Sequence, residues 1–430
     1  MLTNRQRNHI DVPTLTAVLV LMVLSLGVVY SASASWAYEK FGTSSRLLNS
    51  HLIKVLLGIG AMFVGMMLPY KIYQRLTKPA LIAALVFLGI TLVLGGEMKG
   101  ATRWLHFGGM SFQPSEFAKF ALLFHLCALV STKQELMKDF KRGFIPVMIW
   151  VGLVSVFVLA QPNFSAGVMI LALSIVVLYV GCARLSHLFL AAAAMLPVIA
   201  VYVLMAPYRR ERIMMFLDGH SNGKPNYQLL QGIIGFGNGG LFGVGPGESR
   251  QRDFFLPESY GDFVFSIVGE EYGLIGTVLF MGLFLFIMLR GFRIAKYAQD
   301  DFGRLLALAI TSTVTLYALV NASVALGILP TTGQPMPFVS YGGSSLIFSS
   351  FAIGVLLNIS AFTDMHPREQ KHGGQLSEAA TRAAASDFGE TSARPRPEGF
   401  VELSRDARPE GSVEPLNRAA GRQAGVGTVY

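Results

Sequence analysis

Long apolar runs are the feature that most limits what this chain can fold into. At least nine stretches of about 16–25 residues carry few or no charged side chains, and helices of that length can cross the roughly 30 Å hydrocarbon core of a bilayer. Charged residues make up only 14% of the 430-residue chain, whereas soluble domains carry roughly 25%. The sequence therefore excludes a soluble enzyme, a fibrous protein and a secreted domain held by disulfides.

Ten membrane helices are predicted, because backbone polar groups in lipid have to be satisfied within the spanning segment itself. The predicted spans cover residues 13–34, 51–68, 79–95, 116–131, 144–160, 166–183, 187–206, 263–289, 305–329 and 343–362. The expected fold class is all-α: a polytopic membrane protein with about ten transmembrane helices and one long extracytoplasmic loop between spans seven and eight. The first span ends in a signal-peptide-like stretch, but its apolar run is longer than such peptides have, so we expect a retained helix.

Lysine and arginine residues in the short connections predict the orientation of the chain. With a cytoplasmic N-terminus, the inner segments hold fourteen of them, whereas the short outer loops hold only Lys40, Arg46, Lys99 and Arg103. Both termini are therefore expected in the cytoplasm. The net charge of +9 fits this topology and phosphate binding better than nucleic-acid binding, because no basic run interleaved with aromatic residues occurs.

Three parts of the chain differ in composition. Residues 1–12 form a predicted cytoplasmic N-terminus, and residues 13–363 form the ten-helix membrane domain, with its long outer loop at about 207–262. Residues 364–430 lose the apolar pattern and are rich in Ala, Gly, Pro, Arg and Glu. Such a composition buries too little apolar surface to offset the entropy of ordering, so a disordered cytoplasmic tail is expected there.

Ionisable side chains at membrane depth are candidates for function, because placing them in lipid is costly. Glu116 and Lys119 open the fourth predicted span three residues apart, so they share one helix face and can pair. The pair either locks helix packing or supports a catalytic carboxylate beside an active cavity. Glu270 and Glu271 are adjacent in the eighth span and point apart, so at least one of them has to face a cavity or a partner.

Asp262 stands where the long outer loop meets the eighth span, within the stretch Leu256-Pro-Glu-Ser-Tyr-Gly-Asp262-Phe-Val-Phe265. A carboxylate there can accept hydrogen bonds from the first N–H groups of the helix and act as an N-cap. Alternatively, it is a general base at the mouth of a cavity that a lipid-linked substrate enters from the membrane. The residue pattern by itself is compatible with both interpretations.

Four arginines near the predicted outer face are candidates for binding phosphate. One follows the third span, two follow the seventh, and one precedes the Asp262 segment. They are Arg103, Arg209, Arg212 and Arg252. The planar guanidinium group suits phosphate oxygens, and several converging groups suit a diphosphate. For each of them, a solvated loop charge or a contact with a lipid headgroup is the alternative.

The connection between the ninth and tenth spans is rich in proline and glycine at membrane depth and cannot form a regular helix. Irregular backbone at that depth is tolerated only where it is buried in protein or lines a water-filled cavity. We expect it to form a cavity wall; a rigid re-entrant turn without substrate contact is the alternative. The wall candidates are Pro330, Pro335, Pro337, Ser340 and Gly342.

Gly235, Gly237 and Gly240 match the G-x-G-x-x-G pattern of dinucleotide-binding turns. That pattern has meaning only between a strand and a helix of a βαβ unit, whereas here it lies in an outer loop between membrane spans. Turns that need glycine and close backbone approach are the favoured interpretation. No Walker A sequence occurs, so neither a nucleotide cofactor nor ATP-driven transport is expected.

Taken together, these motifs resemble the SEDS family (shape, elongation, division and sporulation) of polytopic peptidoglycan glycosyltransferases. The resemblance covers residues 13–363 and keeps the motifs in order within ten spans. It rests on Lys99-Gly-Ala-Thr-Arg-Trp, Phe112-Gln-Pro-Ser-Glu116-Phe-Ala-Lys119, Gln161-Pro-Asn163, Tyr208-Arg209 to Asp218, Leu256-Pro-Glu to Asp262-Phe-Val-Phe, and Gly327 to Ser345. The stretches Phe140-Lys-Arg-Gly and Gly247-Glu-Ser-Arg-Gln-Arg252 look more like the division branch of the family than the elongation branch.

The resemblance implies that Asp262 occupies the position of the family's essential carboxylate, with Glu116 and Lys119 in a supporting role. The chain departs from the family at Asn163, where an aspartate is usual, and at Gly261, where a threonine usually precedes the catalytic aspartate. Asn163 weakens any requirement for a negative charge at that position, so it is left out of the catalytic set.

By this resemblance the chain polymerises lipid II into glycan strands at the outer face of the bacterial cytoplasmic (inner) membrane during septal cell-wall synthesis. Asp262 would remove a proton from the attacking sugar hydroxyl, and the four arginines would hold the diphosphate leaving group. A divalent cation, Mg²⁺ or Mn²⁺, is a further candidate for that task, and the sequence does not say whether a metal is bound. Competing hypotheses are a flippase for lipid II or another polyprenyl diphosphate, and a non-catalytic scaffold of the division complex.

The resemblance also implies partners. These are lipid II as substrate, a class B penicillin-binding protein acting as transpeptidase, other division proteins, and membrane lipids; no nucleic acid is expected. The multi-pass chain would lie at the division septum. The sequence alone does not say which helices the transpeptidase contacts or whether activity needs the complex.

Overall fold

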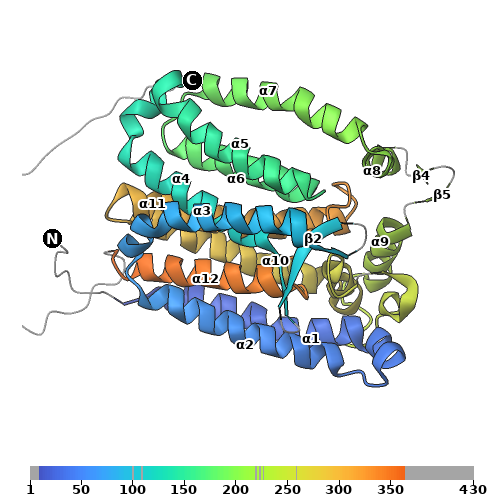
Figure 1. Cartoon of the computed structure of the whole chain (residues 1–430). Helices are drawn as coiled ribbons and strands as arrows, with labels where there is room; N and C mark the ends of the chain where they lie inside the picture. Colours follow the sequence, from blue (N-terminus) through green and yellow to red (C-terminus); the bar gives the residue numbers. More distant parts are fainter. Residues whose placement is uncertain are drawn as a thin grey trace, which may run out of the picture. The chain divides into compact units, whose positions relative to one another are not determined.

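A computed structural model describes residues 9–98, 101–107, 110–217, 220–221, 224–225, 227–257 and 259–363, and Figure 1 shows the arrangement of their helices and strands. The chain divides into two units, Met1–Arg368 and Glu369–Tyr430, and every described residue belongs to the first. The predicted disordered tail at 364–430 and most of the predicted cytoplasmic N-terminus lie outside the described residues.

Ten apolar helices in the described part of the chain match the ten predicted spans. Nine are long and apolar enough to cross a membrane, judged by length and composition, where α5 is taken together with the helical turn before it as Phe140–Ala160. The tenth, α6, has 17 residues. Their bounds are α1 (Val12–Phe41), α2 (Arg46–Met67), α3 (Tyr70–Leu94), α4 (Pro114–Thr132), α5 (Ile145–Ala160), α6 (Phe164–Val180), α7 (Leu185–Leu204), α10 (Val264–Lys296), α11 (Asp301–Ala325) and α12 (Gly343–Ser360). The predicted all-α polytopic membrane fold is confirmed.

Shorter elements occupy the connections between these helices. They are β1 (Gly96–Met98), β2 (Ala101–Phe107), β3 (Met110–Phe112), the 3₁₀ turn η1 (Gln134–Lys138), the π-helical turns η2 (Phe140–Phe144) and η3 (Gln251–Phe255), α8 (Pro207–Leu217), β4 (His220–Ser221), β5 (Lys224–Pro225) and α9 (Tyr227–Gly239). Where the sequence predicts a loop between the third and fourth spans, the structure has an antiparallel sheet in the order β1-β2-β3. Pairing between these strands satisfies backbone groups that a helix would satisfy internally.

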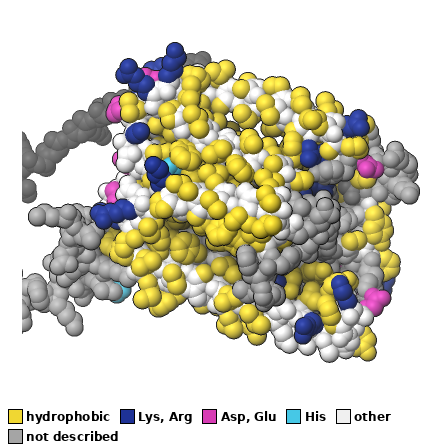
Figure 2. All heavy atoms as spheres, viewed as in Figure 1, with side chains coloured by type: hydrophobic (Ala, Val, Ile, Leu, Met, Phe, Trp, Pro, Cys, Tyr) yellow, Lys and Arg dark blue, Asp and Glu magenta, His cyan; other side chains and the backbone are white. Residues whose placement is uncertain are grey.

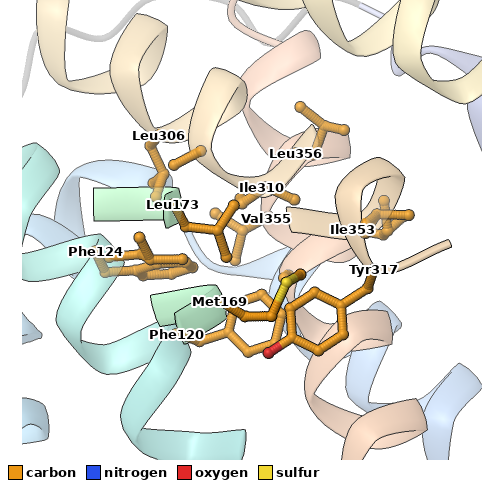
Figure 3. Packing of buried hydrophobic residues seen from close by; sticks show 14 of the residues in the cluster. Phe120, Phe124, Met169, Leu173, Leu306, Ile310, Tyr317, Ile353, Val355 and Leu356 are labelled. Atoms are coloured by element: carbon orange, nitrogen blue, oxygen red, sulfur yellow. The ribbon is translucent and has the colours of Figure 1, made fainter. Parts of the chain in front are cut away.

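The core of the bundle lies around α4, α11 and α12, which bury most of their apolar length, whereas α7 buries only 6% of its most apolar stretch. Figure 3 shows side chains of four helices interlocking in this core. The labelled residues are Phe120 and Phe124 of α4, Met169 and Leu173 of α6, Leu306, Ile310 and Tyr317 of α11, and Ile353, Val355 and Leu356 of α12. Between helices that are all in lipid, such packing stabilises mainly through van der Waals contact.

Glycines let α2 and α12 approach each other closely. A Cβ added at Gly65 would stand 2.4 Å from the Phe351 carbonyl oxygen, and one added at Gly354 would stand 2.0 Å from that of Met62. Small residues at such contacts are typical of membrane helix pairs. The close approach places α2 directly beside the start of α12, where the irregular connection from α11 ends.

Apolar and charged side chains occupy different parts of the surface of the bundle. Figure 2 shows hydrophobic side chains over the long sides of the helices and charged side chains gathered towards the two ends of the bundle. The exposed large apolar residues include Val23, Leu56, Val86, Val156 and Leu279, each from a different helix. This distribution is what a multi-pass membrane protein requires, because lipid tails contact the apolar sides and water contacts the ends.

At one end of the bundle, the start of α1 meets the ends of α10 and α12. Asp11 is fully buried; it forms an ion pair with Arg290 of α10 and accepts hydrogen bonds from the N–H and hydroxyl of Thr14. The Asp11 N–H donates to Ser360 Oγ at 2.9 Å. The first and last described helices therefore begin and end on the same side of the bundle, as an even number of spans predicts.

The long predicted outer loop folds back against a break in α10. Gly273 has φ 63° and ψ −164°, a conformation that only glycine adopts readily. The backbone groups freed by the break pair with residues 240–245: Leu274 N–H donates to the Gly240 carbonyl, and Val244 N–H donates to the Glu270 carbonyl. The backbone groups at the break are thus paired within the protein, as membrane depth demands.

The G-x-G-x-x-G glycines lie in α9 and just after it. A Cβ added at Gly235 would stand 3.3 Å from the Gln251 side chain, whereas Gly237 and Gly240 have open space at that position. Gly240 has φ +51°, a turn conformation that favours glycine. The close backbone approach is made by their neighbour Gly239, because a Cβ there would stand 2.0 Å from the Gly269 carbonyl oxygen of α10. The preceding described element is the two-residue strand β5, which pairs only with β4 in the described part of the chain.

Candidate active site

Asp262 lies at the end of the bundle opposite to Asp11. Arg290, near the end of α10, contacts Asp11, whereas Asp262 precedes the start of the same helix. Its neighbour Ser259 donates to the Ala32 carbonyl at 2.8 Å, and Ala32 is 21 residues along α1 from Asp11, a rise of roughly 30 Å. If the termini are cytoplasmic, as predicted, this carboxylate is on the outer side of the membrane.

A small apolar cluster holds the Asp262 segment in place. The segment contributes Leu256 and Phe263, both buried, and these pack with Ala32 of α1, Ile267 of α10 and Val324 of α11. Phe263 is the residue that caps α10, and it makes no side-chain capping bond, so Asp262 lies one position before the N-cap. The carboxylate is half-buried, which leaves it within reach of a ligand at this end of the bundle.

The connection between α11 and α12 forms the wall beside Asp262. Asn321 Nδ2 donates to the backbone carbonyls of Asp262 and Gln334, each at 2.9 Å, and so ties the two segments together. A Cβ added at Gly333 would stand 3.3 Å from Asp262 Oδ2. Since Gly333 has φ +66° and no side chain, the carboxylate can lie directly against this backbone.

The same connection is irregular throughout, as predicted, and it folds back on itself. Ser340 Oγ accepts a hydrogen bond of 2.8 Å from the Met336 N–H. Gly342 faces Pro335, whose Cβ would be 3.4 Å from a Cβ at that glycine. Of the predicted wall residues, Pro337 and Ser340 are buried, whereas Pro330, Pro335 and Gly342 are partly exposed.

Glu116 and Lys119 form a buried ion pair at the start of α4, 2.9 Å apart. The predicted pairing on one helix face is confirmed. Lys119 Nζ also lies 3.9 Å from the centre of the Tyr317 ring of α11. Tyr317 and Asn321 are four residues apart on α11 and share a face, so the ion pair lies about one helical turn, roughly 6 Å, further into the bundle than the Asp262 segment.

Arg103 and Arg209 lie at the turn between α5 and α6. Arg103 Nε donates to the Gln161 carbonyl at 3.2 Å, and its Nη2 donates to the Pro162 carbonyl. Arg209 Nη1 donates to the Tyr202 carbonyl at 2.7 Å, and the guanidinium carbon lies 3.6 Å from the centre of the Tyr202 ring. Tyr202 in turn donates to the Leu159 carbonyl of α5 at 2.6 Å.

Arg252 lies elsewhere, between α1 and α10. Its Nη1 donates to Ser31 Oγ at 3.3 Å, and its Nε lies 3.4 Å from Asp253 Oδ1. Ser31 donates to the Glu271 carboxylate, whereas the neighbouring Glu270 accepts from Ser249 and from the Gln251 N–H. The two glutamates thus point to different partners, as their adjacency predicts. Arg212 is exposed and lies three residues after Arg209 on α8. Arg252 therefore lies in a different neighbourhood from Arg103 and Arg209.

The chain is similar to known proteins over its whole membrane domain. Residues 13–365 match the model of a family described as cell cycle protein, FtsW, RodA and SpoVE. The chain belongs to the FtsW/RodA/SpoVE family. This confirms the resemblance to the SEDS family, and the match covers all ten apolar helices and the candidate active site.

Relatives within the FtsW/RodA/SpoVE family are similar over almost their whole length. The chain is 38% identical over 353 residues to the probable peptidoglycan glycosyltransferase FtsW of Geobacter metallireducens, covering 81% of this chain and 94% of the relative. It is 36% identical over 354 residues to the stage V sporulation protein E of Bacillus subtilis, covering 81% and 97%. The similarity to FtsW proteins at 37–38% identity confirms the FtsW-like features of the sequence.

Solved structures of the same family share the fold. One is a chain from a study of how a peptidoglycan synthase complex coordinates polymerization and crosslinking; its TM-score is 0.67 at 28% identity, with 82% of this chain and 97% of that chain covered. Another is the rod shape determining protein RodA of Thermus thermophilus, with a TM-score of 0.62 at 25% identity and coverage of 83% and 98%. The arrangement of helices around Asp262 is thus a fold that the FtsW/RodA/SpoVE family shares.

Three further described residues lie around the wall beside Asp262. Asn321 joins the Asp262 segment to the wall, Tyr341 lies near the end of the wall segment, and Lys54 Nζ is 3.3 Å from the centre of the Tyr341 ring. Lys54 has a signal in the sequence, because it is a charged residue inside a predicted span. Tyr341 lies within the Gly327 to Ser345 motif, but its own pattern does not single it out. Asn321 has no comparable signal, since only the fold brings it to the Asp262 segment.

A divalent cation remains a prediction for this FtsW/RodA/SpoVE protein. Among the residues whose side chains the structure describes, no three His, Cys, Asp or Glu side chains come together in a way that could hold a metal ion. The described side chains therefore provide no closed set of metal ligands at Asp262. Mg²⁺ commonly takes one or two protein carboxylates and completes its shell with substrate phosphates and water, and the steps below do not depend on it.

Proposed function

We propose that this protein is a peptidoglycan glycosyltransferase that polymerises lipid II, with Asp262 as its general base. The observation that carries the proposal is the position of Asp262: a half-buried carboxylate against the backbone of Gly333, at the end of the bundle opposite to Asp11. Membership of the FtsW/RodA/SpoVE family and the glycosyltransferase name of the Geobacter relative support the choice of reaction.

The reaction requires a sugar hydroxyl to become a nucleophile. As the 4-hydroxyl oxygen of one lipid-linked chain forms its bond to the anomeric carbon of the other, its proton moves to the Asp262 carboxylate. The bond from the anomeric carbon to the diphosphate breaks, and its electron pair leaves with the diphosphate oxygen. A positioned carboxylate base contributes roughly 10²–10⁴-fold to such a step.

The surroundings of Asp262 suit a base that has to stay in one orientation. Its backbone carbonyl is held by Asn321, and its segment is anchored by the apolar cluster of Phe263 and Leu256. The buried Glu116–Lys119 pair packs on the same face of α11, one turn deeper, through Tyr317. We assign this pair a supporting role: it sets the position of α11, which carries Asn321 to the Asp262 segment.

The closed opposite end of the bundle favours an enzyme over a lipid flippase. A transporter needs an exit on both sides of the membrane, whereas the buried ion pair between Asp11 and Arg290 and the hydrogen bond to Ser360 join three helices at that end. Irregular backbone and half-buried polar groups are concentrated around Asp262. This asymmetry supports chemistry on one face of the membrane.

Partners and location follow from the proposed reaction and from the complex described for the structural relative. We propose a class B penicillin-binding protein as the transpeptidase that crosslinks the product, together with other division proteins. The membrane face that bears Asp262 would be the outer one, with both termini cytoplasmic, and the protein would work at the division septum of a bacterial inner membrane. An arginine-bound diphosphate and a divalent cation belong to the same proposal.

The test uses the full chain, purified with its transpeptidase partner and supplied with lipid II. We expect wild-type protein to form glycan strands and Asp262→Asn to lose roughly 10²–10⁴-fold in rate while its unfolding temperature is unchanged. Asp301→Asn is the matched control, because this exposed aspartate pairs with Arg304 at the opposite end of the bundle and its loss should leave the rate unchanged.

Two results would contradict the proposal. One is normal strand synthesis by Asp262→Asn. The other is wild-type protein that makes no strands with any partner, yet carries fluorescent lipid II across liposome membranes, which would identify a flippase. Recruitment of division proteins by Asp262→Asn at wild-type levels, without any strand synthesis by either protein, would instead identify a scaffold.

A further inference from the structure

Lys54 brings a positive charge to the end of α2 that lies beside the candidate active site. Along the helix, His51 is buried, whereas the apolar residues at 52–53 and 56–57 are exposed on the lipid-facing side. Residues three or four apart on a helix share a face, so Lys54 projects from the same inward face as His51. Its side chain is half-buried, and it does not extend along the lipid-facing surface.

Among the described residues, Lys54 has side-chain contacts but no ion-pair partner. Its Nζ lies 3.3 Å from the centre of the Tyr341 ring, and its methylene carbons line Gly343, whose Cβ position would be 3.4 Å from Lys54 Cε. Within the described part of the chain, every ion pair at 4.0 Å or less is made by other residues. An ammonium group inside a membrane helix is costly without a counter-charge, so an anion from outside the chain would balance it.

Tyr341 connects this lysine to the candidate base. The Tyr341 N–H donates to the Tyr260 carbonyl at 3.0 Å, and the two rings lie 5.8 Å apart, edge to face. Asp262 is two residues beyond Tyr260. Lys54 is therefore linked to the Asp262 segment through Tyr341, at the end of the irregular connection, and Tyr260, in the segment before α10.

Lys54 differs from the arginines in the groups that its charged end contacts within the chain. Arg103 and Arg209 donate to backbone carbonyls, and Arg252 contacts Ser31 and the Asp253 carboxylate. The ammonium of Lys54 instead faces the Tyr341 ring and is hydrogen-bonded to that side chain. A phenol oxygen takes up one of the three N–H donors of an ammonium group, so the others can donate to phosphate oxygens.

We propose that Lys54 binds the diphosphate of the polyprenyl-linked substrate and stabilises it as it leaves. The proposal rests on the function proposed above and names a further binding residue for it. When the bond from the anomeric carbon to the diphosphate oxygen breaks, negative charge grows on that oxygen, and a nearby ammonium lowers the energy of this state. Lys54 touches the leaving group only; the proton of the attacking hydroxyl still goes to Asp262.

Binding can be measured apart from chemistry by working in the Asp262→Asn background. Purified protein in detergent is titrated with undecaprenyl diphosphate and, separately, with the uncharged alcohol undecaprenol. We expect Lys54→Met to weaken binding of the diphosphate roughly 10- to 100-fold, the usual range for a hydrogen bond to a charged group, and to leave undecaprenol binding unchanged. Lys54→Arg should retain most of the diphosphate affinity, because it keeps the charge.

Arg46→Met is the matched control, since Arg46 lies on the same helix, carries the same charge and is exposed. It should not change either affinity. The proposal is overturned if Lys54→Met binds the diphosphate like its parent, or if it loses the diphosphate and the alcohol equally, which would indicate a packing defect. A wild-type protein that makes no glycan strands would refute the proposed function, whereas the titration would still report on Lys54.

Discussion

The two ends of the helix bundle differ in the surroundings of their buried and half-buried charged side chains. At the end that holds the start of α1, Asp11 finds Arg290, Thr14 and Ser360 within the chain. At the other end, Asp262 and Lys54 are half-buried and lie beside irregular backbone. The polar groups at the first end connect three helices by an ion pair and hydrogen bonds. At the second end, Asn321 ties the Asp262 segment to the irregular connection before α12.

The difference shows why charge inside a membrane protein is not by itself evidence of function. Asp11 and Asp262 both adjoin the start of a spanning helix, yet Asp11 accepts hydrogen bonds from the first turn of its own helix, and the N-cap of α10 is Phe263. A cap and an ion pair satisfy a carboxylate completely. Asp262 is instead half-buried beside the backbone of Gly333 and does not cap α10.

The largest effect on stability is expected from removing the ion pair between Asp11 and Arg290. Arg290→Met leaves the fully buried Asp11 without its ion-pair partner, and removing one member of such a pair typically costs about 3–5 kcal/mol. We expect a much lower unfolding temperature in detergent, measured by scanning fluorimetry or circular dichroism. Any glycan synthesis per folded molecule should be unchanged, because Arg290 lies at the end away from Asp262.

Arg304→Met is the comparison for that variant. Arg304 and Asp301 are 2.9 Å apart but 41% and 50% exposed, and exposed pairs contribute about 0–1 kcal/mol. Equal unfolding temperatures for the two variants would show that the ion pair between Asp11 and Arg290 does not stabilise its end of the bundle. The contrast between the two ends would then have no energetic basis.

A smaller effect is expected at the break in α10. In Gly273→Ala, the added Cβ would lie 2.4 Å from the Gly243 backbone nitrogen, and alanine would have to adopt a conformation that costs about 1–3 kcal/mol. The break positions residues 240–245, so both stability and the rate of strand synthesis should fall. Gly282→Ala, with open space at its Cβ, should be neutral or slightly stabilising; equal losses in both variants would contradict a special role for Gly273.

The smallest effects are expected from the predicted diphosphate arginines. Single replacement by methionine of Arg103, Arg209, Arg212 or Arg252 should raise the lipid II concentration needed for half-maximal rate about 2- to 10-fold, since each contributes about 0.5–1.5 kcal/mol. The comparison of the variants would tell which neighbourhood contributes to binding. If all four variants matched wild type in steady-state kinetics, a diphosphate role for these arginines would be refuted.

Much of the fold could be predicted, because lipid restricts a spanning segment to one kind of structure. The predicted spans 79–95 and 343–362 correspond to α3 and α12, which differ from them by up to nine residues at one end. The sheet β1-β2-β3 and helices α8 and α9 were not predictable in the same way, since the segments outside the apolar runs can satisfy their backbone groups in several conformations.

The candidate site could be predicted only in part. Asp262 and the irregular Pro330–Gly342 connection both carry local signals: a carboxylate before a membrane helix, and prolines at membrane depth. Lys54 carries one as well, but nothing in its neighbours along the chain relates it to residues almost 300 positions later. Conversely, the separate neighbourhoods of Arg103 and Arg252 contradict the simple picture of four arginines around one point.

The amino-acid sequence by itself determined that this protein spans a membrane many times, which connections are basic, and which charged residues are unusual for their surroundings. These properties depend on the local composition of each segment, because transfer into lipid is decided segment by segment. Only the tertiary structure decided that Asn321 ties the Asp262 segment to the connection before α12, that Lys54 meets Tyr341, and that Asp11 pairs with Arg290. Contacts between helices depend on packing and on partners far apart in the chain, and local composition does not specify them.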